Sequence, residues 1–205
     1  MQTMSMRNRA AALWAVVALV ICIPSAFGQM SAAKIQLSHD TVLTLEVHRN
    51  ALRATLTKAT SASASVKSTI AVDAAIINAI RDATEIIGIG ARAFADGDRS
   101  YFVLAVATPS VERSGTGFCG AGTEDKLILI EWRGKTRKLV MRDQLEIQSC
   151  LKSIALQSDQ GSELLRLLGK VDDPAHIRLT WLEHPKYHQT TKTVTSQGGK
   201  FVVTE

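Results

Sequence analysis

Short runs in which apolar and polar residues alternate recur along most of this chain, and they constrain its fold more than any other feature. The alternation is clearest in TVLTLEVH (residues 41–48) and LRATLTK (52–58), and it is typical of strands that bury one face. Asp96-Gly97 and Gly134 each separate two such runs, which predicts a hairpin at both places. Further strands are expected over residues 34–38, 85–94, 100–108, 126–132, 136–142, 176–183, 187–196 and 200–204.

Two short segments depart from the β pattern and predict helices. Asp73 is a favourable helix cap, and Ile76 and Ile80 fall on one helical face, so a helix is expected over residues 73–83. A leucine-rich helix is expected over residues 163–170. The predicted fold class is therefore β-dominated α+β, with antiparallel hairpins in a sandwich-like sheet, roughly eight to ten strands, two short helices and one disulfide.

Two stretches carry weaker patterns. Residues 59–69 (ATSASASVKST) are small and polar without periodicity, which predicts a flexible loop. Residues 145–156 fit a helical stripe and a strand, and both readings stay open. The expected organisation is a signal peptide over residues 1–28, N-terminal strands with the Ser/Ala-rich loop over 29–69, and a main β-rich region over 70–205 that forms one domain with them.

The first 28 residues have the features of a secretory signal peptide. Arg7 and Arg9 precede an apolar run of 14 residues over 10–23, and Ala26 and Gly28 are small residues placed as in a cleavage site. A membrane-spanning helix needs about 20 apolar residues, so an uncleaved anchor is the less favoured alternative. We expect a periplasmic or secreted protein with no membrane span after cleavage.

The residues that follow the signal peptide carry little excess charge and two cysteines. They include 22 basic and 19 acidic residues, an excess too small to indicate nucleic-acid binding. Cys119 and Cys150 form an even pair, and in an oxidising compartment such a pair predicts a disulfide. The bridge would close a loop of 32 residues and contribute roughly 3.5–4 kcal/mol on a chain-entropy model.

The loop SGTGFCGAGTED, residues 114–125, contains four glycines around Cys119. Its spacing matches the dinucleotide-binding pattern GxGxxG, but a strand pattern rather than a helix follows, so the phosphate-binding context is missing. A cysteine nucleophile would need a neighbouring histidine, and none lies nearby in the sequence. We therefore expect no cofactor and a structural loop, whose tight path is permitted by Gly115, Gly117, Gly120 and Gly122.

The same loop carries a resemblance to known proteins. The motif Gly115-x-Gly117-Phe118-Cys119-Gly120-Ala121-Gly122-x-Glu124 stands between Pro109-Ser110, with Arg113, and a later Ser149-Cys150-Leu151. In this the chain resembles small uncharacterised exported proteins of Gram-negative bacteria, over roughly residues 100–155. The resemblance implies an envelope protein with a Cys119–Cys150 bridge, and it implies no activity.

A basic stretch at residues 132–142 is a candidate binding surface. Five cations lie within ten residues beside an aromatic ring, which suits an acidic protein face or an anionic envelope polymer. A solvated hairpin that resists edge-to-edge aggregation explains the stretch as well. Its residues are Trp132, Arg133, Lys135, Arg137, Lys138 and Arg142, and Arg113 and Glu124 are further candidate binding residues.

Catalytic and metal-binding patterns are weaker. His184 and His188 have the spacing of two ligands on one strand face, but no third ligand is identifiable, so no metal site is expected. Glu124 and Asp125 are close in sequence, yet nothing indicates that two carboxylates face each other across a cleft. We therefore expect no catalytic residues.

These observations favour an exported, disulfide-stapled binding domain that is not an enzyme. The expected partner is another envelope or secreted protein. An inhibitor or an immunity protein of a secreted effector would be a binding domain of this kind. Two alternatives stay open: a cell-envelope hydrolase or metal-dependent enzyme that uses Glu124/Asp125 or His184/His188, and a carrier of a small ligand. The sequence leaves the oligomeric state undetermined.

Overall fold

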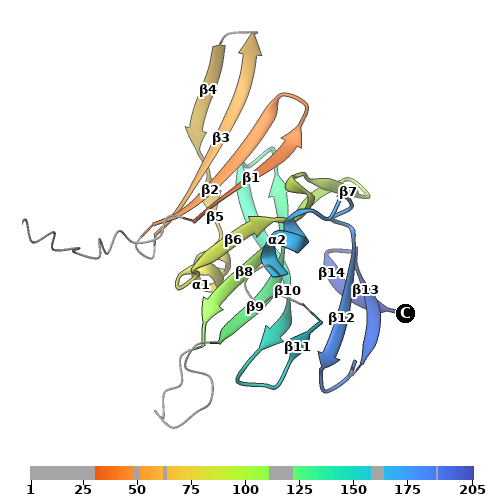
Figure 1. The fold of residues 1–205 in the computed structure, drawn as a ribbon. Helices are drawn as coiled ribbons and strands as arrows, with labels where there is room; N and C mark the ends of the chain where they lie inside the picture. The colour runs from red at the N-terminus through yellow and green to blue at the C-terminus, as the bar shows by residue number, and fades with distance from the viewer. Residues whose placement is uncertain (1–30, 49–50, 62–63, 111–121, 158–163, 188) are drawn as a thin grey trace, which may run out of the picture.

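The structure is a computed structural model that describes residues 31–48, 51–61, 64–110, 122–157, 164–187 and 189–205. Within these residues, fourteen strands form three sheets, which we call the N-terminal, central and C-terminal sheets. The central sheet lies between the other two (Figure 1). The β-dominated fold class with antiparallel hairpins is confirmed, with more strands than the eight to ten expected.

The N-terminal sheet is a four-stranded antiparallel meander. It comprises, in spatial order, β1 (Ser31–Ser38), β2 (Thr41–His48), β3 (Ala51–Ser61) and β4 (Ala64–Thr69). Its alternating runs bury one face, as the sequence predicts, with Leu43 and Leu45 of β2 completely buried. The β3–β4 hairpin extends beyond the other two sheets (Figure 1).

The central sheet contains the long β8–β9–β10 hairpins. Its strands are, in spatial order, β5 (Ala71–Val72), β10 (Lys138–Ser149), β9 (Thr123–Arg133), β8 (Arg99–Pro109) and β6 (Glu85–Gly88), with β7 (Phe94–Asp96) also paired to β8. The turns predicted at Gly97 and Gly134 join β7 to β8 and β9 to β10. Gly97 has a φ of 64°, a conformation that glycine adopts without strain.

The C-terminal sheet comprises β11 (Ala155–Leu156), β12 (His176–Glu183), β13 (Thr190–Gln197) and β14 (Lys200–Thr204), in that order. The strand predicted over 176–183 is confirmed to the residue, and Gly198 and Gly199 form the turn between β13 and β14 with φ of 59° and 78°. Residues 145–156 resolve as strand, because β10 continues to Ser149 and β11 follows after a turn.

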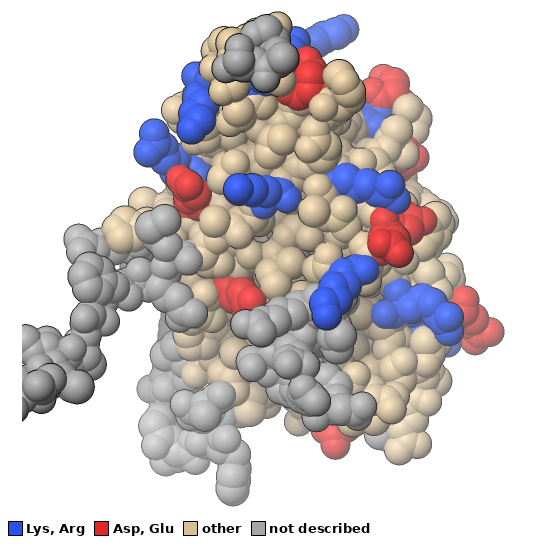
Figure 2. All heavy atoms as spheres, turned by 45° about the horizontal axis from the view of Figure 1, so that its top comes forward, with Lys and Arg blue, Asp and Glu red and all other residues tan. Residues whose placement is uncertain are grey.

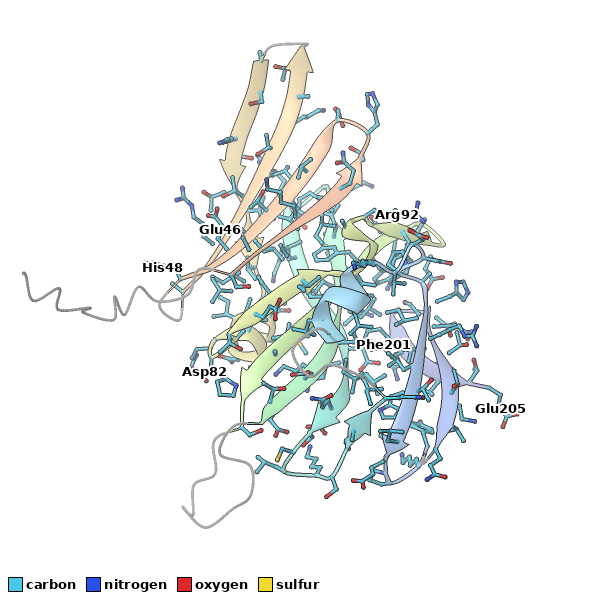
Figure 3. All side chains as sticks on the ribbon, in the orientation of Figure 1. Glu46, His48, Asp82, Arg92, Phe201 and Glu205 are labelled. Carbon is cyan, nitrogen blue, oxygen red and sulfur yellow. The ribbon has the colours of Figure 1, made fainter. Side chains whose placement is uncertain are left out.

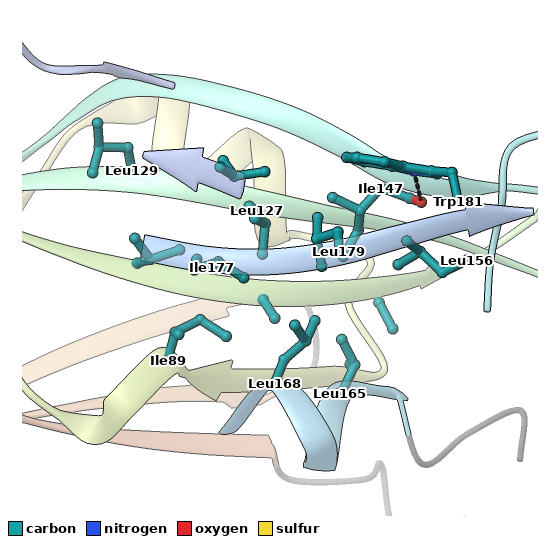
Figure 4. Packing of buried hydrophobic residues seen from close by; sticks show 14 of the residues in the cluster. Ile89, Leu127, Leu129, Ile147, Leu156, Leu165, Leu168, Ile177, Leu179 and Trp181 are labelled. Atoms are coloured by element: carbon teal, nitrogen blue, oxygen red, sulfur yellow. Dashed lines mark hydrogen bonds between the residues drawn. The ribbon is translucent and has the colours of Figure 1, made fainter. Parts of the chain in front are cut away.

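The central sheet is buried on both faces, and this makes the fold three-layered. All seven residues from Tyr101 to Ala107 of β8 are buried. Side chains such as Leu127 and Leu129 pack against the C-terminal sheet (Figure 4), whereas Leu104 and Ile128 pack against the N-terminal sheet. A strand covered on both sides needs apolar residues at successive positions, which explains the unbroken run in this part of the sequence.

Two helices and a 3-10 turn fill the spaces between the layers. Helix α1 (Ala74–Ile80) is capped by Asp73, whose Oδ1 accepts from Ala75 N at 3.2 Å, and it buries Ile76 and Ile80. Helix α2 (Leu164–Gly169) packs Leu165 and Leu168 into the core shared with the C-terminal sheet (Figure 4). Besides these two helices the structure has a 3-10 turn, η1 (Ile89–Ala91), so its helical content differs from the two helices expected.

Turn η1 corrects the single strand predicted over residues 85–94. Gly90 has a φ of 61°, and a Cβ there would lie 3.0 Å from Pro174 Cδ and from Val171 O. The chain therefore turns at this glycine and passes close to the segment before β12, so β6 and β7 are separate strands. Ala93 N donates to Gln36 O at 2.8 Å and ties this turn to the N-terminal sheet.

The flexible loop predicted over residues 59–69 is wrong, because β3 runs to Ser61 and β4 occupies Ala64–Thr69. The physical reason is exposure: five of the six residues of β4 are exposed, so the strand needs no buried apolar face. Small Ala, Ser and Thr residues together with Val66 are compatible with an exposed strand, and they lack the alternation that marks a half-buried one.

Candidate functional site

The cations of the basic stretch divide between two sides of the β9–β10 hairpin. On the side of the C-terminal sheet, Arg133 donates to the carboxylate of Glu131 through Nε and Nη2, at 3.1 and 3.2 Å. Arg142 Nε lies 3.7 Å from the same carboxylate. The hydrogen bond from Arg133 holds the pKa of Glu131 below its usual value, and the charges of Arg133, Arg142 and Arg99 act in the same direction.

Arg137 lies on the opposite side, toward the N-terminal sheet. Its Nη2 donates to Ser68 Oγ of β4, and its carbonyl accepts from Ala71 N at 3.2 Å. Lys135 and Lys138 are exposed. The stretch is therefore no single basic patch. The face of the molecule drawn in Figure 2 carries basic and acidic groups interspersed.

A surface groove of about 500 Å³ lies between the N-terminal sheet and the β9–β10 turn, and we call it the hairpin groove. Four of its lining residues are apolar: Leu37, Leu56, Val66 and Trp132. The others are Ser38, Thr41, Lys58, Thr60, Ser68, Gly134 and Arg137. The face that packs Leu43 and Leu45 into the core therefore continues along β3 and β4 to a region that no described element covers.

The charged side chains that line the hairpin groove have one sign. Most of the lining comes from two stretches without any Asp or Glu, residues 47–72 and 132–142, and Leu37, Ser38 and Thr41 of the β1–β2 hairpin complete it. Glu46, the last acid before the first stretch, pairs with Arg53 across β2 and β3 at the base of the N-terminal sheet (Figure 3). Among the described lining residues, the two charged side chains are Lys58 and Arg137.

One acid approaches the rim. Asp40, in the β1–β2 turn, has its Oδ2 at 3.6 Å from Lys58 Nζ. Hydrogen bonds from Ser38 and Thr41 lower its pKa to about 2, with a smaller contribution from Lys58. Both side chains are substantially exposed, so this ion pair neutralises Lys58 only weakly.

The groove borders a sheet edge. Within the described residues, β4 pairs with β3 alone, so its other edge is uncovered. Ile70 N donates to Ala54 O at 3.2 Å, whereas Ala59 N donates to Asp40 O at 2.9 Å. Even-numbered residues of β3 therefore direct their backbone groups toward β4, and odd-numbered ones toward β2.

The end of the glycine loop is closely packed against the start of the turn after β10. A Cβ at Gly122 would lie 2.9 Å from Cys150 Cβ and 3.2 Å from its Sγ, so only glycine fits there. Glu124 accepts from Ser110 Oγ at 2.5 Å and from Leu151 N at 3.3 Å, which joins β8, β9 and this turn. The other residues of the predicted loop, which are Arg113, Gly115, Gly117, Cys119 and Gly120, lie outside the described residues.

Glu124 and Asp125 are consecutive on β9, and both line a second surface hollow together with Lys126, Gln144, Glu146 and Lys152. Asp125 is 4% exposed, and its burial raises its pKa to about 6, with smaller contributions from the charges of Glu124 and Glu85. Its Oδ1 is buried and has no hydrogen-bond partner among the described residues.

His184 belongs to an aromatic cluster. Its ring stacks on Tyr187 with centroids 4.5 Å apart and lies 5.2 Å from Trp181, and its Nδ1 accepts from Lys186 N at 2.9 Å. Burial lowers its pKa, and the charge of Lys186 adds to this. His188 lies outside the described residues, and the described part of the chain contains no group of three or more possible metal ligands.

Comparison with known proteins leaves the chain without an assigned family, since no protein-family model and no curated protein matches it. None of the described helices has the length and apolar character that crossing a membrane requires. The predicted signal peptide, residues 1–28, lies outside the described residues. The functional argument therefore rests on the geometry of the hairpin groove and its neighbours.

Sequence reasoning identified one wall of the hairpin groove and missed the other. Trp132 and Arg137 belong to the predicted basic stretch. Val66 and Ser68 fall where a loop was expected, and Lys58 ends a strand predicted over residues 52–58. One signal was present in the sequence, namely the absence of acids over residues 47–72, which contain four Lys or Arg residues. Two acid-free stretches that far apart indicate a shared positive surface only once the topology brings them together.

Proposed function

We propose that this protein is an extracytoplasmic, disulfide-stapled domain that binds another envelope or secreted protein and has no catalytic activity of its own. The observation that carries the proposal is the hairpin groove, which combines apolar side chains with the cations Lys58 and Arg137 beside a sheet edge that no described strand covers. Interface anchors are typically large apolar or aromatic side chains in such hollows, surrounded by polar groups. Inhibition of a secreted effector is one role that this mode of binding serves.

The groove is suited to binding rather than to chemistry. Its polar lining consists of hydroxyl groups and two cations, and it brings together no nucleophile with a base and no pair of carboxylates. The buried carboxyl group of Asp125 lies on β9 outside this lining, and His184 is held in its aromatic cluster. These placements support a binding role over the hydrolase and metal-enzyme alternatives.

The Cys119–Cys150 bridge remains part of the proposal. Cys119 precedes Gly122 by three residues, and Gly122 packs directly against Cys150. Three residues of chain span at most roughly 10 Å, so this packing is compatible with a bridge between Cys119 and Cys150. An oxidising compartment, which the predicted signal peptide indicates, would keep the bridge formed.

The proposal is tested by placing a photo-crosslinking amino acid at Val66 in the full chain, in the cells that normally produce it. Leu182 provides a matched control position, because both are exposed apolar residues (57% and 46%) and Leu182 lies in the C-terminal sheet. We expect one saturable crosslinked protein from Val66 and none from Leu182. Charge reversal of Arg137 to Glu should weaken that crosslink at least about fivefold.

Three results would contradict the proposal. Equal crosslinking from Val66 and Leu182 would indicate non-specific contact, and no crosslink from Val66 at any expression level would remove the groove as a binding surface. Purified chain that turns over an envelope polymer would replace binding with catalysis.

A further inference from the structure

We infer that the partner contributes an extended acidic segment, which adds to the free edge of β4 as a fifth strand of the N-terminal sheet. This inference rests on the proposed function and specifies how the partner binds. An uncovered edge offers a row of backbone donors and acceptors to another chain, and strand addition satisfies them.

The backbone groups that would receive the segment are identifiable from the ladder. Even-numbered residues of β3 face β4, and Leu56 and Lys58 are paired with Ser68 and Val66. Val66 and Ser68 therefore use their N–H and C=O groups within the sheet. The N–H and C=O groups of the alternate residues, Ser65, Lys67 and Thr69, point to the open edge.

The length of the open edge is set by the central sheet. Just after β4, Ala71 N donates to Arg137 O, and Ala71–Val72 pairs in parallel with Lys138 and Leu139 of β10. Among the described strands, β10 thus covers the edge from Ala71 onward, and none covers it over Ala64–Thr69. Six residues of strand correspond to about 20 Å, which is an ordinary strand length for peptide addition.

The side chains beside this edge fix the chemistry of the segment. Alternate side chains on its inner face would lie next to Val66 and Ser68, at the hairpin groove, and those on its outer face next to Lys67. Lys58 and Arg137 line the groove, and residues 47–72 contain no acid. Opposite charges on neighbouring strands attract, so apolar or β-branched residues that alternate with Asp or Glu complement this surface.

A second copy of the same chain is the poorer occupant. Antiparallel pairing of two β4 strands would place the lysines of one acid-free hairpin close to those of the other. Like charges on adjacent strands repel, and a lysine on an edge strand is a known obstacle to self-association.

The test is a selection of random ten-residue peptides for binding to the purified full chain, followed by affinity measurement with the best peptide. We expect selected peptides with at least two Asp or Glu residues that alternate with Val, Ile, Thr or aromatic residues, and no Pro in the core. Lys67→Pro removes an outward N–H that the fold does not use, and it should weaken binding at least about tenfold. Lys67→Gln keeps that N–H and should weaken binding less than about threefold.

Amide hydrogen exchange on the unmodified chain gives a readout that does not depend on the variants. Saturation with the selected peptide should slow exchange at Ser65, Lys67 and Thr69 at least about tenfold and leave β8 unchanged. Selected peptides without acidic enrichment, equal binding by the Lys67→Pro and Lys67→Gln variants, or protection elsewhere would each overturn the inference. A dimer that Lys67→Pro dissociates would assign the edge to a second copy instead.

The two proposals fail in different ways. A specific crosslink from Val66 together with unprotected β4 amides would retain protein binding at the hairpin groove and remove strand addition. The loss of both would remove the binding surface itself.

Discussion

Strands β8 and β4 are both antiparallel strands of this protein, yet their environments are opposite. Seven consecutive residues of β8 are buried between two layers, whereas five of the six residues of β4 are exposed. β8 has paired neighbours on both sides, and β4 has one described neighbour. The strands that stabilise the fold, such as β8, are therefore distinct from β4, which exposes backbone groups and charged side chains to solvent.

The contrast has an energetic meaning. Burial of apolar area contributes about 25 cal/mol per Å², so the doubly covered strands dominate the stability of the domain. Strand β4 adds little buried area, so it should contribute little to the stability of the fold. An edge strand that is retained without stabilising the core is a candidate for binding, and Lys67 at that edge limits aggregation.

The largest effect on stability is expected from removal of the proposed Cys119–Cys150 bridge. Replacement of both Cys119 and Cys150 by Ser should lower the free energy of unfolding by roughly 3.5–4 kcal/mol, because the open chain gains conformational entropy. Urea unfolding of the variant against the oxidised chain measures this. Mass analysis that finds two alkylatable thiols in the exported protein would refute the bridge.

Truncation of a core side chain compares the two strands directly. Leu104→Ala should cost about 3 kcal/mol, because Leu104 is fully buried in β8 against the N-terminal sheet. Val66→Ala in β4 is the matched variant and should change the free energy of unfolding by less than about 0.5 kcal/mol. Similar costs at the two positions would show that β4 is part of the stabilising core.

Removal of the Glu131 charge tests the ion pairs that hold the β9–β10 hairpin. Glu131→Gln should lower the free energy of unfolding by about 1–2 kcal/mol at pH 7. The loss is modest because both arginines are partly exposed and solvent screens their attraction to Glu131. The folded-state pKa is lowered from 4.5, so the native charge stabilises above pH 4.5 and this contribution is lost as the pH falls through the folded value. The variant and the unmodified chain should therefore converge once the pH has fallen below the folded-state pKa of Glu131.

The smallest effect is expected at Asp125 and has the opposite sign. Its pKa rises from 3.8 to about 6 on folding, so the folded state favours the protonated form and loses stability as the pH rises between these values. Asp125→Asn should raise the free energy of unfolding by about 1 kcal/mol at pH 8 and change it little at pH 4. A variant that is less stable at both values would show that the carboxylate has a partner.

The sequence predicts those parts of the fold that follow from patterns among neighbouring residues. The alternation of residues 41–48 and 176–183, the Asp73 cap and the turns at Gly97 and Gly134 all depend on neighbours close in sequence. They were predicted correctly. The three-layered arrangement could not be predicted from the sequence. It depends on which sheet covers each face of β8, and the continuous apolar run of this strand does not specify the two sheets that pack against it.

The candidate site was predictable only in part, for the same reason. Trp132 and Arg137 were identified from local charge density beside an aromatic ring. Val66 and Ser68 had no local signal, since β4 is stabilised by pairing with β3 rather than by its own pattern. The groove arises because Arg137 reaches Ser68 across 69 positions of sequence.

The most direct test of the separation between stability and binding is amide hydrogen exchange, measured on the free chain and with the selected acidic peptide. In the free chain the slowest amides should lie in β8 and β9, and Ser65, Lys67 and Thr69 should exchange at least about a thousandfold faster. The peptide should slow those three amides and leave β8 unchanged. Slow exchange throughout β4 in the free chain, or peptide protection confined to the C-terminal sheet, would contradict the account.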